Sequence, residues 1–178
     1  MIGNGNVAKS VTFSSRLQSD IFTVLEKEAL SKNISMNSLV NNVLGKYTSL
    51  DRYSKDIEVV SLTKRVVKHI FNNMNDKHVE QLANEVGGVV HKELIFLKFD
   101  ELTFENLIHV MIVNATRYGS VKYHSENSKH SIFIHHGVCL QFSKFLALVH
   151  EITSNNLSIN MKVTNIDNDT ISIELIEP

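Results

Sequence analysis

The chain opens on an alternation of apolar and polar positions. Apolar side chains stand at Val11, Phe13 and Leu17, and polar side chains fill the positions between them, with Ser15 as the one polar residue on the apolar side. A period of two residues is typical of a β-strand that buries one face. The pattern therefore predicts a half-buried strand over residues 10–17.

Two amphipathic helices are expected after this strand. Ser19 and Asp20 supply N-cap chemistry for the first helix, which should end near Asn33, a residue that tolerates the left-handed conformation closing a helix. Ser35 is a second N-cap. The residues after it recur at helical spacing, and the apolar ones are Leu39, Val40, Val43, Leu44 and Tyr47.

One strand and two short helices cannot bury this much apolar surface by themselves. A lone strand has two free edges and is not stable in water. The simplest arrangement pairs the strands of two chains antiparallel and packs four helices beneath them. We therefore predict a homodimer, or a tetramer built from it.

These residues resemble the ribbon-helix-helix family of DNA-binding proteins. The resemblance covers residues 8–50 and rests on the strand Val11–Leu17 with its terminal Arg-Leu pair, on the acidic helix after it, and on the stretch Ile34–Leu44. Gln18 stands where proline is common in the family. The resemblance implies a β-α-α fold in an intertwined dimer and a sequence-specific DNA-binding transcriptional regulator.

The same arrangement suggests which side chains touch DNA. A two-stranded ribbon fits the major groove, and its outward residues Thr12, Ser14 and Arg16 would contact base edges. Only Arg16 can form a bidentate contact with guanine. Contacts with phosphates are predicted for the arm and for the start of the second helix, at Lys9, Ser35, Met36 and Asn37. The expected partner is double-stranded DNA with an inverted or direct repeat.

The rest of the chain is patterned as helices followed by strands. Helical stripes run over 62–74, 76–86, 104–118 and 142–152, with stops at Gly87-Gly88 and Gly119. Period-two segments run over 121–126, 130–136, 159–163 and 171–175, and residues 127–129 form a hairpin loop by composition. Residues 89–99 fit either a buried strand or the end of a helix.

The predicted fold class is α+β. A flexible arm (1–9) and a ribbon-helix-helix domain (10–50) precede a linker (51–56) and a C-terminal α+β domain (57–178). This last domain is expected to be an antiparallel sheet covered by helices, and to serve effector sensing or oligomerisation. The effector is not identified by any motif.

Charge and cysteine content add to this division. Residues 1–55 hold seven cations and four anions, net +3, whereas the remaining residues hold 11 cations and 15 anions, net −4. The net positive charge of the first part favours binding to a polyanion. Cys139 is the only cysteine, so no intrachain disulfide can form, and no apolar run or signal peptide points to a membrane. These features predict a cytoplasmic protein.

A cluster of histidines raises the question of a metal site. His124, His130, His135, His136 and Cys139 fall within 16 residues, on or beside one hairpin. Adjacent strand residues such as His135 and His136 face opposite sides, so they cannot both join one site. We therefore expect structural histidines and no metal or cofactor, with His124, His130, His136 and Cys139 as the candidates if one binds. Sensing of pH or anions is the other use of such residues.

No enzyme signature is present. The chain has no glycine-rich phosphate loop, nucleophile elbow or His-Glu-x-x-His motif, and its basic part lacks the aromatic stacking motifs of RNA-binding modules. We expect a protein that is not an enzyme.

The alternative to a regulator is an antitoxin-like interaction adaptor with autoregulatory DNA binding. The long, apolar and patterned C-terminal part favours a folded domain over a disordered tail.

Overall fold

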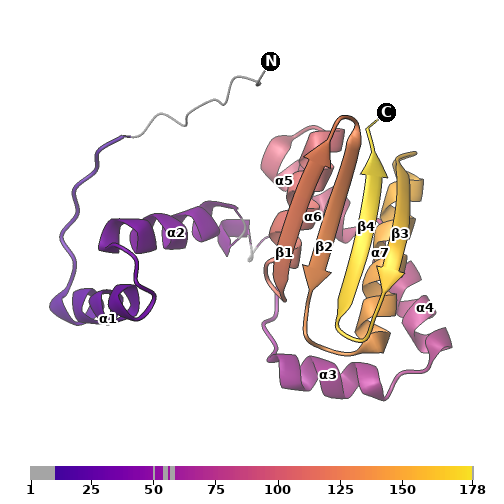
Figure 1. Ribbon diagram of the computed structural model, residues 1–178, viewed down its shortest axis with the longest axis horizontal. Helices are drawn as coiled ribbons and strands as arrows, with labels where there is room; N and C mark the ends of the chain where they lie inside the picture. Colours follow the sequence, from indigo (N-terminus) through magenta and orange to yellow (C-terminus); the bar gives the residue numbers. More distant parts are fainter. Residues whose placement is uncertain (1–10, 50, 54–55, 57–58, 178) are drawn as a thin grey trace. The chain divides into compact units, whose positions relative to one another are not determined.

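The computed structural model describes residues 11–49, 51–53, 56 and 59–177 (Figure 1). It separates into two units, Met1–Thr48 and Ser49–Pro178. The division falls just before the linker predicted over 51–56. Each unit is described below by itself.

The first unit contains two helices, α1 (Ser19–Ser31) and α2 (Met36–Ser49). Asn33 adopts the left-handed conformation, with φ of 52°, in the turn between them. The Oγ atom of Ser35 accepts a hydrogen bond from the backbone N–H of Ser38 over 3.1 Å, so Ser35 caps α2 as predicted. Helix α1 begins without a side-chain cap, because Gln18 occupies its N-cap position.

The predicted N-terminal strand is wrong. Residues 11–18 are neither strand nor helix, and the side chains of Val11 and Phe13 are 85% and 80% exposed. An alternating segment becomes a strand only when another strand supplies hydrogen-bonding partners. The described part of the first unit offers none, and the four strands of the second unit pair with one another. The β-α-α ribbon-helix-helix fold expected for 10–50 is therefore corrected to an extended segment followed by two helices.

The second unit begins with helices. After a short 3₁₀ helix (Asp51–Tyr53) come α3 (Lys64–Asn72), α4 (Asp76–Val86), α5 (Val90–Phe99) and α6 (Phe104–Ala115). Side-chain caps fix two of the starts. Asn75 accepts a hydrogen bond from the N–H of His78 at the start of α4, and Thr103 accepts one from Asn106 at the start of α6.

Helix α5 settles the segment that the sequence left open between strand and helix. Leu94 and Ile95 are buried, whereas Phe96 and Leu97 are more than 40% exposed. Apolar residues therefore occupy both the buried and the exposed side of this helix. For this reason the periodicity of residues 89–99 did not distinguish a helix from a strand.

One antiparallel sheet forms the rest of the second unit. Its strands are β1 (Ser120–Glu126), β2 (Lys129–His135), β3 (Asn160–Ile166) and β4 (Thr170–Ile176), and helix α7 (Leu140–Asn156) connects the two hairpins. The spatial order is β1-β2-β4-β3, so β4 lies between β2 and β3. The order of strands and helix along the chain is the one the hydrophobic pattern predicts.

Helices α5, α6 and α7 lie on one face of this sheet (Figure 1). The inward side chains of the two central strands are almost fully buried: Ile132, Ile134, Ile171, Ile173 and Leu175. The outward residues between them include Ser131, Phe133 and His135. Alternation between a buried and a solvated face is the signature of an antiparallel sheet covered on one side.

Three phenylalanines join the helices to this core. The ring of Phe71 on α3 meets Phe142 edge-on, with centroids 5.0 Å apart, and lies 5.3 Å from Phe145. Such pairs contribute about 0.5–1.5 kcal/mol beyond the area they bury. No described helix has the length and apolar composition needed to span a membrane.

Candidate functional site

The residues predicted to touch DNA lie at the start of the described chain. Thr12, Ser14 and Arg16 are exposed on the extended segment, and Met36 and Asn37 form the first turn of α2 behind its cap Ser35. Lys9 and the rest of the arm lie outside the described residues. The contacts of all these side chains with bases and phosphates stay predictions.

The first unit carries an extensive exposed apolar surface. Its described residues 11–48 bury only Ala29 and Leu39. Ten large apolar side chains are at least 45% exposed, and we call them the N-terminal apolar surface: Val11, Phe13, Leu17, Ile21, Phe22, Val24, Leu30, Val43, Leu44 and Tyr47. Apolar side chains exposed in such number are typical of an interaction site.

The stripe on α2 shows how little of this surface the unit covers by itself. Leu39 is 2% exposed, whereas Val43 and Tyr47, one and two turns further along the same face, are 51% and 56% exposed. The dimer expected from the sequence, with four helices packed beneath paired strands, stays a prediction.

The histidines proposed as metal ligands do not converge. His124 is exposed and faces the solvated side of β1, while His130 lies on the helix-covered side and contacts Tyr123. His136 and Cys139 follow the opposite end of β2, about 20 Å along the strand from His130. Within the described residues, no group of three or more potential ligands comes together.

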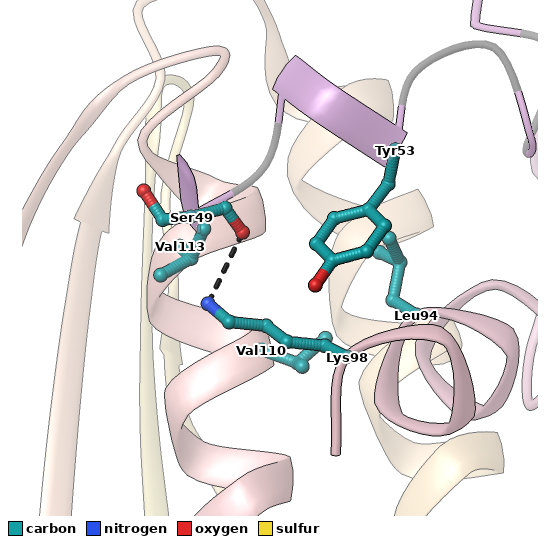
Figure 2. A pocket seen from close by; sticks show the side chains of 6 residues that line it. All are labelled: Ser49, Tyr53, Leu94, Lys98, Val110 and Val113. Atoms are coloured by element: carbon teal, nitrogen blue, oxygen red, sulfur yellow. Dashed lines mark hydrogen bonds between the residues drawn. The ribbon is translucent and has the colours of Figure 1, made fainter. Parts of the chain in front are cut away.

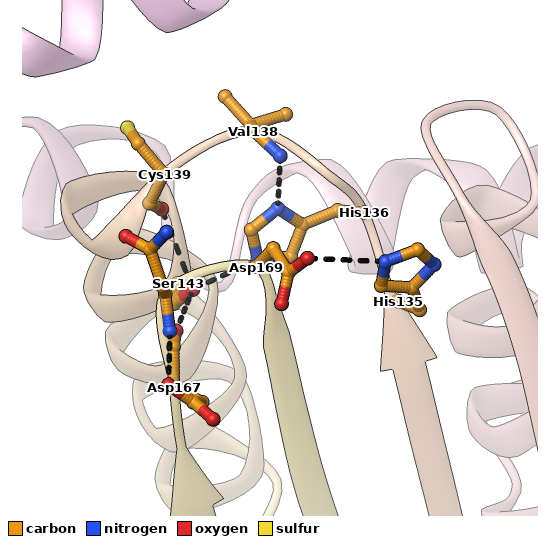
Figure 3. A network of polar contacts seen from close by, with 8 residues as sticks. His135, His136, Val138, Cys139, Ser143, Asp167 and Asp169 are labelled. Atoms are coloured by element: carbon orange, nitrogen blue, oxygen red, sulfur yellow. Dashed lines mark hydrogen bonds and ion pairs between the residues drawn. The ribbon is translucent and has the colours of Figure 1, made fainter.

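His136 instead belongs to a hydrogen-bond network in the turn between β2 and α7 (Figure 3). Its Nδ1 accepts the backbone N–H of Val138 over 3.1 Å, so a neutral ring carries its proton on Nε2. Nε2 then donates to Oγ of Ser143 over 2.8 Å, and that hydroxyl donates to the carbonyl oxygen of Asp167 over 2.6 Å. The network ties the β2–α7 turn to the β3–β4 turn.

The electrostatics of His136 agree with a structural role. The ring is fully buried, and burial lowers its pKa to about 4, against a smaller opposing effect of Asp169. His135, its neighbour, points outward and pairs with Asp169 at 3.2 Å. As expected for adjacent positions at the end of a strand, the two rings occupy different environments.

A small cavity lies beside the 3₁₀ helix (Figure 2). Lys98 crosses it and donates a hydrogen bond to the carbonyl oxygen of Ser49 over 3.1 Å, and Tyr53 and Leu94 form its walls. Burial, and next the charge of Arg52, lower the pKa of Lys98. The cavity has a volume of about 10 Å³, enough for at most one water molecule. It is therefore a packing feature and not a ligand site.

The chain is only weakly similar to known proteins. No family model and no curated protein matches the chain. Among solved structures, the H-NOX from Shewanella woodyi bound to IWP-051 is 10% identical with a TM-score of 0.27, over 99% of this chain and 80% of that one. Two H-NOX structures from S. oneidensis, in the Fe(II) and Fe(II)NO states, are each 13% identical with a TM-score of 0.25, over 96% of this chain and 80% and 82% of theirs. Scores this low assign neither fold nor function.

The conformation of residues 11–17 corrects the predicted function. A sequence-specific DNA-binding regulator, and equally an antitoxin-like adaptor with autoregulatory DNA binding, was expected to read DNA with a ribbon strand over 10–17. Residues 11–17 form no strand. The prediction of a transcriptional regulator is therefore wrong.

Proposed function

We propose that the chain works by self-association, with the first unit joining two copies into a homodimer that carries two α+β units. The observation behind this proposal is the N-terminal apolar surface. A unit of fewer than fifty residues that buries only two side chains among those described cannot offset its loss of conformational entropy. Covering the apolar surface supplies the missing stabilisation.

A second copy is the occupant that this surface fits best. The described residues 11–48 hold four Lys or Arg and three Asp or Glu, so two copies repel each other little. In a two-fold arrangement the same patch faces itself, and the stripe of Val43 and Tyr47 on one α2 meets the matching stripe on the other. The resemblance to ribbon-helix-helix chains also implies pairing of two chains. Pairing through the helices does not need the ribbon.

The proposal describes a protein that is not an enzyme and that resides in the cytoplasm. Cys139 supports the second point, because the sole cysteine is buried and free. Association would place the second units of two chains in one particle and let them act together.

Sedimentation of the full chain across a range of concentrations tests the proposal. We expect a particle of twice the chain mass. The double substitution Val43→Asp with Tyr47→Asp should weaken the dimer by roughly 2 kcal/mol or more. It removes an aromatic side chain from the interface and places like charges opposite each other in the two copies. Leu140→Asp is the matched control, since Leu140 is an exposed apolar residue of the second unit, at 41%. A wild-type chain that sediments as a monomer throughout overturns the proposal.

A further inference from the structure

An open cleft of about 400 Å³ lies entirely within the second unit. The extended segment 59–62, helix α3, the residues that follow α6 and the turn between β2 and α7 surround it. Its volume falls in the range of small-molecule sites, which is roughly 300–1,000 Å³. No residue of this cleft belongs to the N-terminal apolar surface.

The inner wall of the cleft is apolar and aromatic. Val138 is 3% exposed and Phe142 is 7% exposed, and the ring of Tyr118 meets that of Phe142 edge-on with centroids 5.6 Å apart. Val67 on α3 completes this wall. Burial raises the pKa of Tyr118, so its phenol stays protonated and can only present a neutral hydroxyl. Such a wall suits a hydrocarbon or aromatic body.

Two cationic side chains line the cleft. Among the described lining residues the charged ones are Lys64 and Arg117. The ammonium group of Lys64 forms no hydrogen bond or ion pair with the residues that the structure describes, and it lies within 3.7 Å of the position that a Cβ on Gly137 would occupy, at the β2–α7 turn. A cation beside an apolar wall is complementary to a single negative charge on an otherwise apolar molecule.

We propose that this cleft binds a small monocarboxylate with an apolar tail, its carboxylate against Lys64 and its tail against Val138, Tyr118 and Phe142. The ligand is a free acid in solution. The binding requires neither the homodimer nor the N-terminal apolar surface.

Calorimetric titration of the full chain with decanoate, below the concentration at which it forms micelles, tests this proposal. We expect one decanoate for each chain. Decyltrimethylammonium, which has the same tail and the opposite charge, should bind about tenfold more weakly or worse, the scale of one charge-assisted hydrogen bond. Equal binding of the two would overturn the proposal, because the cations would then play no part.

Two variants of α3 locate the site. Lys64→Glu should weaken decanoate binding by about tenfold or more. Lys68→Glu makes the same charge change one turn further along the helix, at an exposed residue that does not line the cleft, and should leave the affinity within about twofold. Both residues are exposed, so unchanged thermal unfolding will show that the fold is intact. Equal losses in the two variants, or no heat of binding to the wild-type chain, would show that the cleft is not a carboxylate site.

Discussion

His91 on α5 and His150 on α7 pack against each other inside the second unit, with ring centroids 5.1 Å apart and the ring planes tilted by 41°. Both are at least 98% buried, and three of their four ring nitrogens have no hydrogen-bond partner among the described residues. Burial lowers the pKa of His91 to about 4 and that of His150 well below its usual value, which the neighbouring His91 lowers further. The interior therefore holds two neutral imidazoles.

This pair predicts a loss of stability in mild acid. The unfolded chain takes up protons near pH 6.5 while the folded chain resists protonation down to about pH 4, so stability is fully present above about pH 6.5 and falls below it. Between about pH 7.5 and pH 5, His91 alone should cost about 2 kcal/mol. Urea unfolding at the two pH values measures the difference.

His150→Leu is the informative variant for that prediction. It removes one of the two titrating groups of this pair, so the stability should depend less steeply on pH. His78→Gln, at an exposed histidine of α4, is the control. Identical stability of the wild-type chain at both pH values would contradict this account of the pair.

A second prediction concerns the network of His136. Ser143→Ala removes the acceptor of the Nε2 proton and the donor to the Asp167 carbonyl oxygen, and leaves both groups without their partner. Unsatisfied buried groups cost about 1–3 kcal/mol. We expect the free energy of unfolding to fall by that amount, seen as a lower midpoint of urea unfolding with an unchanged slope. Ser125→Ala, at an exposed position of β1, is the control, and a loss as large there would mean that the network is not the cause.

Helix capping gives a third prediction. Asn75→Ala removes the side-chain acceptor for the N–H of His78 at the start of α4 and should destabilise the unit by about 1 kcal/mol. Asn84→Ala makes the same chemical change at an exposed position in the last turn of that helix, where alanine is the better helix former, and should be neutral or stabilising. Thermal unfolding of the two variants measures this difference. An equal loss of stability in both would show that capping by Asn75 is not the cause.

Two glycines provide a fourth prediction. A Cβ at Gly119 would collide with the carbonyl oxygen of His135, whereas a Cβ at Gly45 in α2 would meet no atom within 4 Å. Gly119→Ala should therefore cost roughly 1–3 kcal/mol through a forced shift of the backbone. Gly45→Ala should cost nothing and raise the helicity of α2. Circular dichroism during thermal unfolding measures both, and a harmless Gly119→Ala would show that the approach to His135 is looser than described.

Local signals in the sequence located most of the second unit. Asn75 and the glycines at 87–88 mark the ends of α4, and the alternation over 171–175 marks β4, because both patterns are set by neighbours in sequence. The segment 10–17 shows the limit of that reasoning. It alternates like β4, with only Ser15 out of place, but a strand also needs a partner edge, and pattern alone does not report whether one exists.

The candidate sites were harder to predict because they join distant residues. Lys64, Arg117 and Val138 line one cleft although more than 70 positions separate the first from the last. His91 and His150 meet across 59 positions, and neither stood in the histidine-rich segment that drew attention in the sequence. Conversely, His124 and His136 are near in sequence and far apart on the sheet. Proximity along a chain is a poor guide to convergence once strands carry neighbours apart.

The place of β4 in the sheet has a consequence for synthesis of the protein. It is the last of the described strands along the chain, yet it lies between β2 and β3 and contributes Ile171, Ile173 and Leu175 to the centre of the core. A ribosome adds roughly 5–20 residues per second, so about 2–7 s pass between the emergence of β2 and that of β4. For this interval the nascent chain exposes an unfilled hydrophobic sheet edge, and the speed of translation, more than the intrinsic rate of folding, sets how long it depends on protection from aggregation.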